Sequence, residues 1–476
     1  MKNALNMQAL RKYFLSHQKE IIADLFGLVR IPSVKAAGVP GMPFGKNCYK
    51  ALSYASALFA REGIDVDIEK EGRYAIAFLG EKSIASSVGV FAHTDVVPAG
   101  EGWLYTEPFS PIVHDGCAIG RGVEDNKAGV VLALWALKYI KENGIALARP
   151  ITVFLGANEE SGMEDIEAFV KQEGVPFVSL VPDSEYPVCY GEKGIAHAYM
   201  TAKVPFTDIL EIRGGSAFNV VLDNVSLTLA LREERAKELI RALAPLKDIE
   251  TEWENSSLVI KAKGISAHAS MPEGSKNAAY VLFRALSSVS ALCEGDREIL
   301  KQAAYILEKT DGSVASLNRQ EESFSPLTMA NGIVRTEKGK LAFSLDIRYG
   351  ESVGERELEE RLAACANEHG FSLAMEENKQ GFINDKNGRA LSVILDACER
   401  FSGTRPEPFL MGGGTYCRYL SNAYSVGTTV PYVADSYNAP RGHGGAHQCD
   451  EHLPLDAFFE NLALFTEMLC QLSDIE

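Results

Sequence analysis

Three short, mostly apolar runs in the first half of the chain end in acidic or histidine side chains, and this pattern most limits the folds that the sequence can adopt. The runs cover residues 88–93, 151–160 and 177–183. They alternate with stretches of helical periodicity, including the one that follows Asp125. Continuous apolar strands that alternate with amphipathic helices are typical of a mainly parallel sheet covered by helices on both faces. The sequence therefore predicts an α/β fold.

The polar residues at the ends of these runs are predicted to meet. In a parallel sheet the carboxyl ends of the strands share one edge, where open α/β sheets bind their ligands. One acidic residue after a strand is most often a solvated turn residue, but several strand ends with the same pattern are hard to assign to chance. Asp125 joins them at the start of a long helix, where free N–H groups favour a carboxylate. The strand-end residues are His93 and Asp95, Glu159 and Glu160, and Asp183 and Glu185.

A crevice with this many carboxylates and imidazoles predicts a metal site. Oxygen and nitrogen donors without a thiolate suit zinc, manganese or cobalt. The chain has nine cysteines but no C-x-x-C pair, so neither a disulfide framework nor a thiolate zinc site is expected. This use of cysteine fits the reducing cytoplasm.

The middle of the chain has a different character. Its strand-like segments alternate polar and apolar residues, and charged helical stretches lie near them. We expect an inserted α+β lid domain over residues 190–382, built of two similar halves, and a metal-binding catalytic domain formed by residues 1–189 and 383–476.

Overall charge and hydropathy exclude several partners. With 64 acidic and 47 basic residues the formal net charge is -17, which disfavours nucleic acid and anionic membrane surfaces. The most apolar helical run, residues 129–140, contains Lys138 and is too short to span a bilayer. No segment resembles a signal peptide, so a cytoplasmic protein is expected.

Seven segments, in order along the chain, together resemble one known family. They are residues 91–103, 107–129, 156–162, 181–185, 263–278, 412–416 and 444–451. The resemblance is to the co-catalytic di-zinc peptidases and deacylases, which include carboxypeptidase G, the acetylornithine and succinyl-diaminopimelate hydrolases, aminoacylases and carnosinases. The length, the long insertion and the "GGGTY" segment look most like the bacterial PepV-type dipeptidases, a monomeric branch.

The resemblance implies a set of metal ligands. His93 and Asp183 would bind one ion, Glu160 and His447 would bind the other, and Asp125 would bridge both. Two divalent ions are expected, most often zinc, with manganese or cobalt as alternatives.

It also implies residues that act beside the ions. Asp95 matches a carboxylate suited to orient the His93 ring, and Glu159 matches the general base that takes a proton from the attacking water. His268 matches a donor to the developing oxyanion, and Arg348 matches the arginine that holds the substrate carboxylate. Helpers in substrate binding are Asn219, Gly414 and Thr415.

Several points stay open in the sequence. His443 is the alternative to His447 as a ligand, and His452 is expected at the surface. Arg348 could instead form a salt bridge at a strand edge. Many relatives have a second aspartate where Asn126 stands, so a cis peptide bond after Asp125 is not settled by the resemblance. The histidines expected to be ordinary surface or packing residues are His17, His114, His197 and His369.

Taken together, the sequence predicts a metal-dependent dipeptidase. Its substrates would be dipeptides with free amino and carboxyl ends, including β-alanyl and Xaa-His dipeptides. An N-acyl-amino-acid deacylase is the alternative within the same chemistry, and a catalytically silent metal-binding protein is the alternative outside it. A monomer that acts on small peptides is expected.

Overall fold

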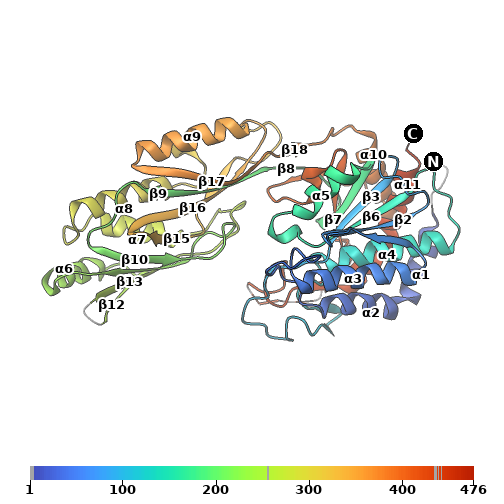
Figure 1. The fold of residues 1–476 in the computed structure, drawn as a ribbon, viewed down its shortest axis with the longest axis horizontal. Helices are drawn as coiled ribbons and strands as arrows, with labels where there is room; N and C mark the ends of the chain where they lie inside the picture. The colour runs from blue at the N-terminus through green and yellow to red at the C-terminus, as the bar shows by residue number, and fades with distance from the viewer. Residues whose placement is uncertain are drawn as a thin grey trace. The chain divides into compact units, whose positions relative to one another are not determined.

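The computed structural model describes residues 5–254, 257–431, 433, 437, 439–440 and 442–475. The chain divides into two compact units. Unit 1 comprises Met1–Gly191, Ile383–Phe409 and Thr415–Glu476, and unit 2 comprises Glu192–Phe382 and Leu410–Gly414. Figure 1 shows that each unit has a sheet with helices packed on it. Among the described residues, no helix has both the length and the apolar character to cross a membrane.

The sheet of unit 1 is mixed. Its order is β1-β2-β6-β3-β7-β20-β8-β18, with β19 paired to β8. The four central strands β6, β3, β7 and β20 pair in parallel, and β1, β2 and β8 pair antiparallel to their neighbours at the sides. The predicted parallel sheet is thus confirmed at the centre. The strand bounds are β1 (Asp65–Ile68), β2 (Tyr74–Leu79), β3 (Val88–His93), β6 (Ile151–Gly156), β7 (Val178–Ser184), β8 (Cys189–Glu192), β18 (Phe382–Ile383), β19 (Phe409–Met411) and β20 (Ala423–Gly427).

The strand order explains why helices cover both faces of this sheet. The chain passes from β3 through α4 (Lys127–Glu142) to β6 on one side, then through α5 (Glu164–Glu173) to β7 on the other side of β3. Right-handed crossovers in opposite directions place their helices on opposite faces, and Figure 1 shows α4 below and α5 above the sheet. Such a reversal of direction marks the edge where open sheets bind ligands.

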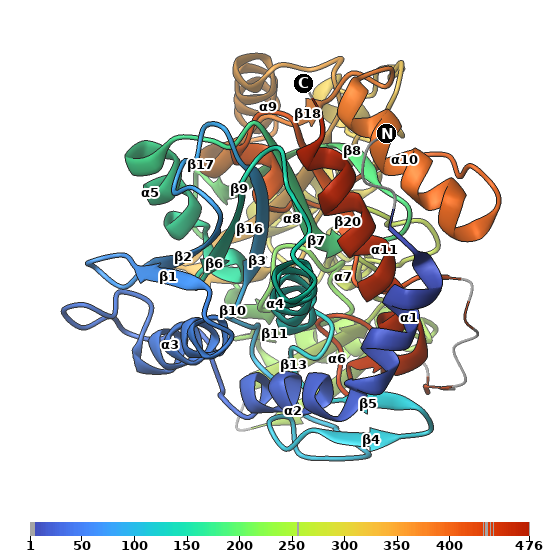
Figure 2. The same cartoon turned by 90° about the vertical axis from the view of Figure 1, so that its right-hand side faces the viewer.

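Helix α4 is buried almost all round. Thirteen of its sixteen residues are buried, as expected for a helix that is covered on every side. It contacts α2 (Gln18–Val29), α3 (Lys46–Arg61) and α11 (Leu455–Ser473), which surround it in Figure 2. The apolar stretch after Met7 forms α1 (Met7–Ser16) and α2 with a break at His17. The remaining long helix of unit 1 is α10 (Arg389–Ser402).

A small three-stranded sheet joins two distant segments of unit 1. Its order is β21-β5-β4, with bounds His452–Pro454, Cys117–Ile119 and Ile112–His114. His452 pairs with Ile119 in this sheet. Residues 444–451 are thereby brought beside the segment that leads to Asp125.

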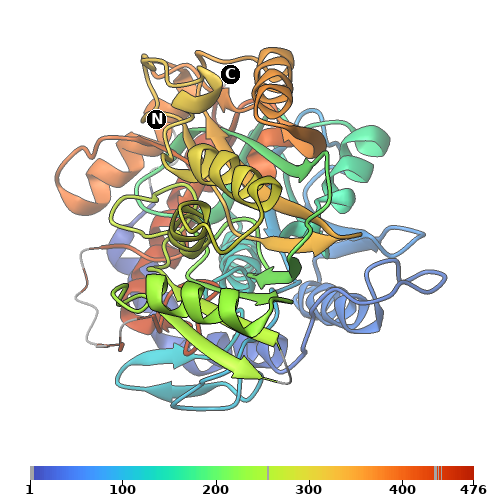
Figure 3. The same ribbon diagram turned by 90° about the vertical axis from the view of Figure 1, so that its left-hand side faces the viewer.

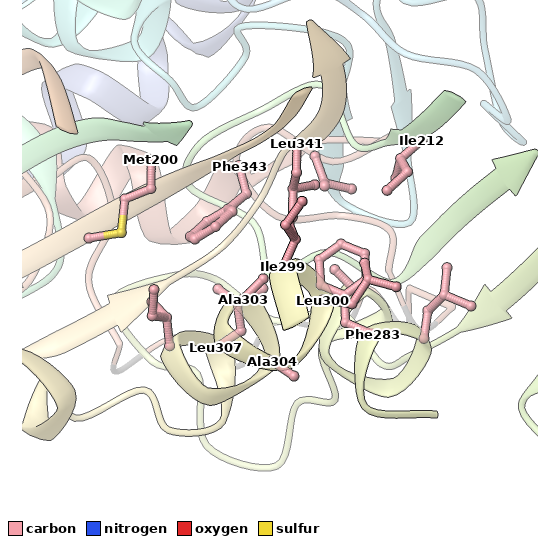
Figure 4. Close-up of a cluster of buried hydrophobic side chains, with 14 of the residues drawn as sticks. Met200, Ile212, Phe283, Ile299, Leu300, Ala303, Ala304, Leu307, Leu341 and Phe343 are labelled. Atoms are coloured by element: carbon pink, nitrogen blue, oxygen red, sulfur yellow. The ribbon is translucent and has the colours of Figure 1, made fainter. Parts of the chain in front are cut away.

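The sheet of unit 2 is antiparallel throughout its described pairings, and one face of it carries the core. Side chains alternate between buried and partly exposed along β9 (Gly194–Ala202), the pattern of a sheet with one covered face. Figure 4 shows Met200, Phe343 and Leu341 from the strands packed against α8 (Glu294–Leu307), and Phe283 from α7 (Ala278–Ser287) beside them. Each such fully buried side chain contributes roughly 1.5–3 kcal/mol. Figure 3 views this unit from the side of its helices.

The order of this sheet is β12-β13-β11-β10-β15-β16-β9-β17, with β14 paired to β16. The strands are β9 (Gly194–Ala202), β10 (Ile209–Gly214), β11 (Asn224–Leu229), β12 (Ile249–Glu254), β13 (Ser257–Lys263), β14 (Thr328–Ala330), β15 (Val334–Glu337), β16 (Lys340–Tyr349) and β17 (Phe371–Lys379). The helices are α6 (Glu233–Leu243), α7 (Ala278–Ser287), α8 (Glu294–Leu307) and α9 (Glu355–Glu368).

Candidate metal centre and substrate-binding residues

His93, the last residue of β3, points its ring at two carboxylates. Its Nε2 lies 3.2 Å from Asp125 Oδ1 and 3.8 Å from Asp183 Oδ2. Its Nδ1 lies 3.1 Å from the carbonyl oxygen of Asp95. A carbonyl oxygen can only accept, so Nδ1 donates its proton to it, and Nε2 is the ring nitrogen that faces the carboxylates. This is the orientation in which a histidine binds a metal ion.

His447 faces the other side of Asp125. Its Nε2 lies 3.0 Å from Asp125 Oδ2 and 3.1 Å from Glu160 Oε2. The two oxygens of Asp125 are therefore each directed at a different histidine. A carboxylate that bridges two metal ions needs this arrangement.

The buried atoms of the cluster fit cations rather than hydrogen-bond donors. Within the described part of the chain, His93 Nε2 and Glu160 Oε1 are buried and make no hydrogen bond of acceptable geometry. Ligand atoms of His93, Asp125 and Glu160 lie within 4.8 Å of one another, as do those of His93, Glu159 and Asp183. Imidazole and carboxylate donors without thiolate suit zinc, manganese or cobalt.

The protonation equilibria of the cluster also favour added positive charge. Burial raises the pKa of Glu160 to about 7, and the negative charge of Asp125 acts in the same direction. Burial likewise raises the pKa of Glu159 well above its usual value, although His93 opposes the shift. Burial lowers the pKa of His447, but hydrogen bonds to Asp125 and Glu160 outweigh it and raise the pKa to about 11. Bound cations would relieve the same repulsion between carboxylates.

The structure distinguishes the three histidines near the end of the chain. Nδ1 of His443 lies 2.6 Å from Asp450 Oδ2, and Nδ1 of His452 lies 2.7 Å from the carbonyl oxygen of Gly444. Of the three, His447 is the one placed against Asp125 and Glu160.

Asn126 ties His93 and Asp183 together. Its Nδ2 donates to Asp183 Oδ1 at 3.0 Å, and its Oδ1 accepts the N–H of His93 at 3.3 Å. The peptide bond between Asp125 and Asn126 is cis, which answers the question that the sequence left open.

Asp95 holds the backbone of both glutamates. Its Oδ1 and Oδ2 accept the N–H groups of Glu159 and Glu160, each at 3.1 Å. Its Oδ1 lies 3.5 Å from His93 Nδ1, further away than the Asp95 carbonyl oxygen to which that nitrogen donates. The carbonyl oxygen of Asp95 is therefore the acceptor of the His93 ring proton, while the Asp95 side chain, predicted to orient that ring, holds the short helical turn Glu159–Ser161 that carries the glutamate pair.

Glu451 supports the loop before Asp125 and was not assigned a role from the sequence. Its fully buried carboxylate accepts the N–H groups of Gly122, Glu124 and Asp125 at 2.9 to 3.1 Å. Arg121 Nη1 donates to the same carboxylate at 2.7 Å. The resemblance to the family covers Glu451, but its partners lie more than 320 residues away along the chain, so no local pattern indicates the contact.

Asp165 and Tyr416 support the end of β6. Asp165 Oδ2 accepts the N–H groups of Ala157 and Asn158, and the Tyr416 hydroxyl donates to it at 2.6 Å. A Cβ at Gly156 would lie 1.9 Å from that hydroxyl oxygen. The glycine before the glutamate pair is therefore required by the approach of Tyr416.

A cavity of about 300 Å³ lies beside the cluster in unit 1. Asp125 and Asp183 form part of its wall, so a small molecule in it would contact the predicted metal ligands. Its lining residues are Glu124, Asp125, Asn126, Asp183, Ser184, Glu185, Thr428 and Ala446.

Unit 2 brings three of its predicted site residues onto one connected surface. The backbone carbonyl oxygen of Asn219 accepts the N–H of Ala269, and the neighbouring Val220 forms a β-bridge with His268. His268 Nδ1 lies 2.7 Å from Ser270 Oγ. Ser270 packs against Gly412, whose carbonyl oxygen accepts a hydrogen bond from Arg348 Nη1 at 3.2 Å. Gly414 belongs to the same unit, whereas Thr415 belongs to unit 1.

Arg348 also forms a buried ion pair. Its Nε and Nη2 donate to the two oxygens of Asp346 at 2.6 and 2.9 Å. The salt bridge that the sequence offered as an alternative role for Arg348 therefore exists. Nε and Nη2 are used in this ion pair and Nη1 donates to Gly412, so one N–H of Nη1 and one of Nη2 take no part in these three bonds.

Comparisons with known proteins agree with this architecture. The model of the family described as "Peptidase family M20/M25/M40" matches residues 89–471. A protein of Staphylococcus epidermidis named "Putative dipeptidase" is 25% identical over 470 residues, which cover 96% of this chain and 97% of that protein.

Two solved structures share the fold across nearly the whole chain. The dipeptidase Dug1p of Saccharomyces cerevisiae has a TM-score of 0.62 at 14% identity and covers 99% of this chain and 100% of its own. Human carnosine dipeptidase 1 has a TM-score of 0.60 at 15% identity and covers 98% of this chain and 99% of its own.

Proposed function

This chain belongs to peptidase family M20/M25/M40, and from that premise we propose that it is a dipeptidase with two divalent metal ions, most often zinc. Manganese and cobalt are the alternatives that the donor set allows. The observation that carries the proposal is the placement of Asp125, whose two oxygens face His93 and His447 on opposite sides.

The proposed ligands divide into two sets that share Asp125. His93 and Asp183 belong to the first set, and Glu160 and His447 belong to the second. Two divalent ions held there would supply Lewis-acid activation of a water molecule and of the scissile carbonyl.

Glu159 is the proposed general base. It would take a proton from the attacking water and pass it to the leaving amine. A base of this kind works best when its pKa is near the working pH, and burial shifts the pKa of Glu159 upward in that direction. Hydrogen bonds from the backbone N–H groups of Glu159 and Glu160 to Asp95 hold the backbone that carries this side chain.

The substrate contacts proposed for unit 2 are carried by Arg348 and His268. The N–H groups of Nη1 and Nη2 of Arg348 that are not used for Asp346 and Gly412 would bind the C-terminal carboxylate of the dipeptide. His268 would donate to the carbonyl oxygen as negative charge develops on it. Asn219, Gly414 and Thr415 are proposed helpers in holding the substrate.

Peptide length and end groups define the proposed substrate class. Dipeptides with free amino and carboxyl ends are proposed, including β-alanyl and Xaa-His dipeptides, because the relative and both solved structures are named as dipeptidases and one is named for carnosine. We also propose that the protein acts as a monomer in the cytoplasm. All nine cysteines are free thiols, which suits a reducing compartment.

The test is a substrate panel with metal-loaded protein before and after chelation. It contains dipeptides, tripeptides, and N-acetylated and N-succinylated amino acids. We expect rapid hydrolysis of dipeptides, loss of activity on chelation and recovery when zinc is returned. Faster turnover of the acylated amino acids would identify a deacylase, and activity that survives complete metal removal would contradict the proposed chemistry.

A further inference from the structure

A charged network in unit 2 surrounds the proposed carboxylate-binding arginine. Asp346 stands two residues before Arg348 on β16, so both side chains lie on the same face of the strand. Asp346 is fully buried, and the side chain of Arg348 is 6% exposed. An arginine that is paired in two places with a buried carboxylate is held in one orientation, but the pair together carries no net charge.

His197 adds a second positive charge to this network. It lies directly opposite Asp346 on the adjacent strand β9. Its Nε2 is 3.1 Å from Asp346 Oδ2, and its Nδ1 is 3.1 Å from Glu377 Oε2 on β17. Because carboxylates accept hydrogen bonds, an imidazole with one at each nitrogen satisfies both only as the doubly protonated cation.

The charges of the network sum to a positive value only when His197 is protonated. Glu377 is also paired with Lys379, whose Nζ is 3.2 Å from its carboxylate. Arg348, His197 and Lys379 supply three cations, and Asp346 and Glu377 supply two anions. If His197 were neutral, the network would offer a substrate carboxylate no net attraction.

His197 also supports the segment that carries Asn219. Its ring stacks on Phe218, with centroids 4.6 Å apart and an interplanar angle of 25°. Phe218 immediately precedes Asn219. The backbone carbonyl oxygen of Asn219 accepts the N–H of Ala269, the residue after His268. One histidine thus contacts both the partner of Arg348 and the neighbour of Asn219.

We propose that His197 and Asp346 are positioning residues that make Arg348 selective for substrates with a free C-terminal carboxylate. Asp346 fixes the guanidinium so that one defined edge is available, and His197 restores the positive charge that Asp346 cancels. The inference rests on the proposed role of Arg348 in substrate binding, and it goes further by assigning the specificity to residues that do not touch the substrate.

The first experiment compares a dipeptide with its C-terminal amide in the wild type and in His197→Gln. We expect His197→Gln to raise KM for the dipeptide about tenfold, while KM for the amide and both kcat values change less than about twofold. The matched control is His369→Gln, the same substitution in the same unit at a histidine that contacts Gln302 and Tyr305 instead. It should retain the wild-type preference for the free carboxylate.

A pH series separates charge from packing. Burial lowers the pKa of His197, but hydrogen bonds to Asp346 and Glu377 outweigh it and raise the pKa to about 9. A raised pKa means that the cation is present at neutral pH and is lost as the pH rises through that value. The ratio of the amide KM to the dipeptide KM should therefore fall above pH 9 in the wild type and stay constant in His197→Gln. The charged and titratable groups around the ring are Asp346 and Arg348 on β16, Glu377 and Lys379 on β17, and Tyr199 on β9.

Calorimetry with a non-hydrolysable dipeptide analogue and its amide makes the result independent of turnover. A wild type that binds both equally, or a His197→Gln variant that keeps the full preference for the free carboxylate, would overturn the inference even if dipeptides are hydrolysed. A wild type that hydrolyses no dipeptide would contradict the proposed function, and the binding data would still decide the role of His197. If thermal unfolding shows that His197→Gln does not fold, Glu377→Gln replaces it. This variant lacks one anion, so Arg348 and Lys379 outweigh Asp346 even when His197 is neutral, and we expect the preference to persist above pH 9. A fall above pH 9 like that of the wild type would overturn the inference.

Discussion

The two units each bury carboxylates against histidines, but only one of these clusters is complete by itself. In unit 2 the guanidinium of Arg348, the ring of His197 and the carboxylate of Asp346 satisfy one another. In unit 1 the carboxylates outnumber the cations, and His93 Nε2 and Glu160 Oε1 lack hydrogen bonds among the described residues. Buried polar groups without partners are costly, so they persist where something else binds them.

This difference separates a network that positions a side chain from a site that requires an added ligand. Coulombic repulsion among close carboxylates grows as water is excluded. We therefore expect the cluster of unit 1 to depend on cations from solution, and the network of unit 2 to depend only on the protonation of one histidine. Variants and metal removal should affect the two clusters differently.

The largest effect is expected when Glu159 and Glu160 are substituted separately. Glu159→Gln should lower kcat about 10³-fold and retain both metal ions, because it removes the proposed base and no ligand. Glu160→Gln should lose metal, because it removes one of the oxygens that faces His447. Metal content per chain and kcat, measured on the same samples, check the prediction. Equal loss of metal in both variants would show that the two carboxylates do not have separate roles.

Removal of metal should destabilise unit 1 selectively. At a free concentration of 1,000 times Kd, one bound ion stabilises the folded state by about 4 kcal/mol. After chelation, amide hydrogen exchange should accelerate in residues 88–93 and 151–162, which lead to the ligands. Exchange in β9 and β16 of unit 2 should not change. Uniform acceleration in both units would contradict the comparison.

The sequence could predict which residues meet in the cluster of unit 1, because each of them follows a local signal. His93, Glu160 and Asp183 are polar residues that end apolar runs. His447 lies in residues 444–451, one of the segments that resemble the family. The parallel centre of the first sheet also follows from apolar runs that alternate with helices. The antiparallel edge strands and the break between α1 and α2 have no comparable signal.

The supporting residues could not be predicted, because their partners are distant in the chain. Glu451 contacts the loop before Asp125 across more than 320 residues. His197 was expected to be an ordinary surface or packing histidine, and it meets Asp346 only because strand register places the two opposite each other. A single sequence does not reveal the register of strands that lie 149 residues apart.

A substitution of Glu451 tests whether unit 1 also contains a buried network whose polar groups satisfy one another. Glu451→Gln would leave the guanidinium of Arg121 buried without its anion, because Arg121 has a side chain only 1% exposed. Loss of one partner from a buried ion pair costs about 3 kcal/mol or more. We expect a lower free energy of unfolding, measured by chemical denaturation, together with weaker metal binding, because glutamine keeps one acceptor oxygen and its NH2 group cannot accept the N–H groups of the loop before Asp125 that the other oxygen accepts. Unchanged stability would mean that Glu451 is not needed to hold this loop.

Tyr416 gives the smallest expected effect and the finest test of the comparison, because its partner Asp165 is a buried carboxylate of unit 1 that is satisfied by the protein alone. Tyr416→Phe removes one hydrogen bond and retains the ring, so we expect a loss of about 1–2 kcal/mol in the free energy of unfolding at pH 7.5.

Burial, with a contribution from the charge of Asp95, raises the pKa of Asp165 to about 6. Below pH 6 the carboxyl is protonated, and the lost bond is then one to a neutral acceptor, which is weaker than one to an ion. The difference in unfolding free energy between wild type and Tyr416→Phe should therefore shrink as the pH falls from 7.5 to 5, and metal content should stay the same at pH 7.5. A difference that does not change with pH would show that Asp165 remains ionised throughout. A loss of metal would instead show that Asp165 and Tyr416 at the end of β6 form one network with the proposed metal ligands. The two groups of residues in unit 1 would then not be independent.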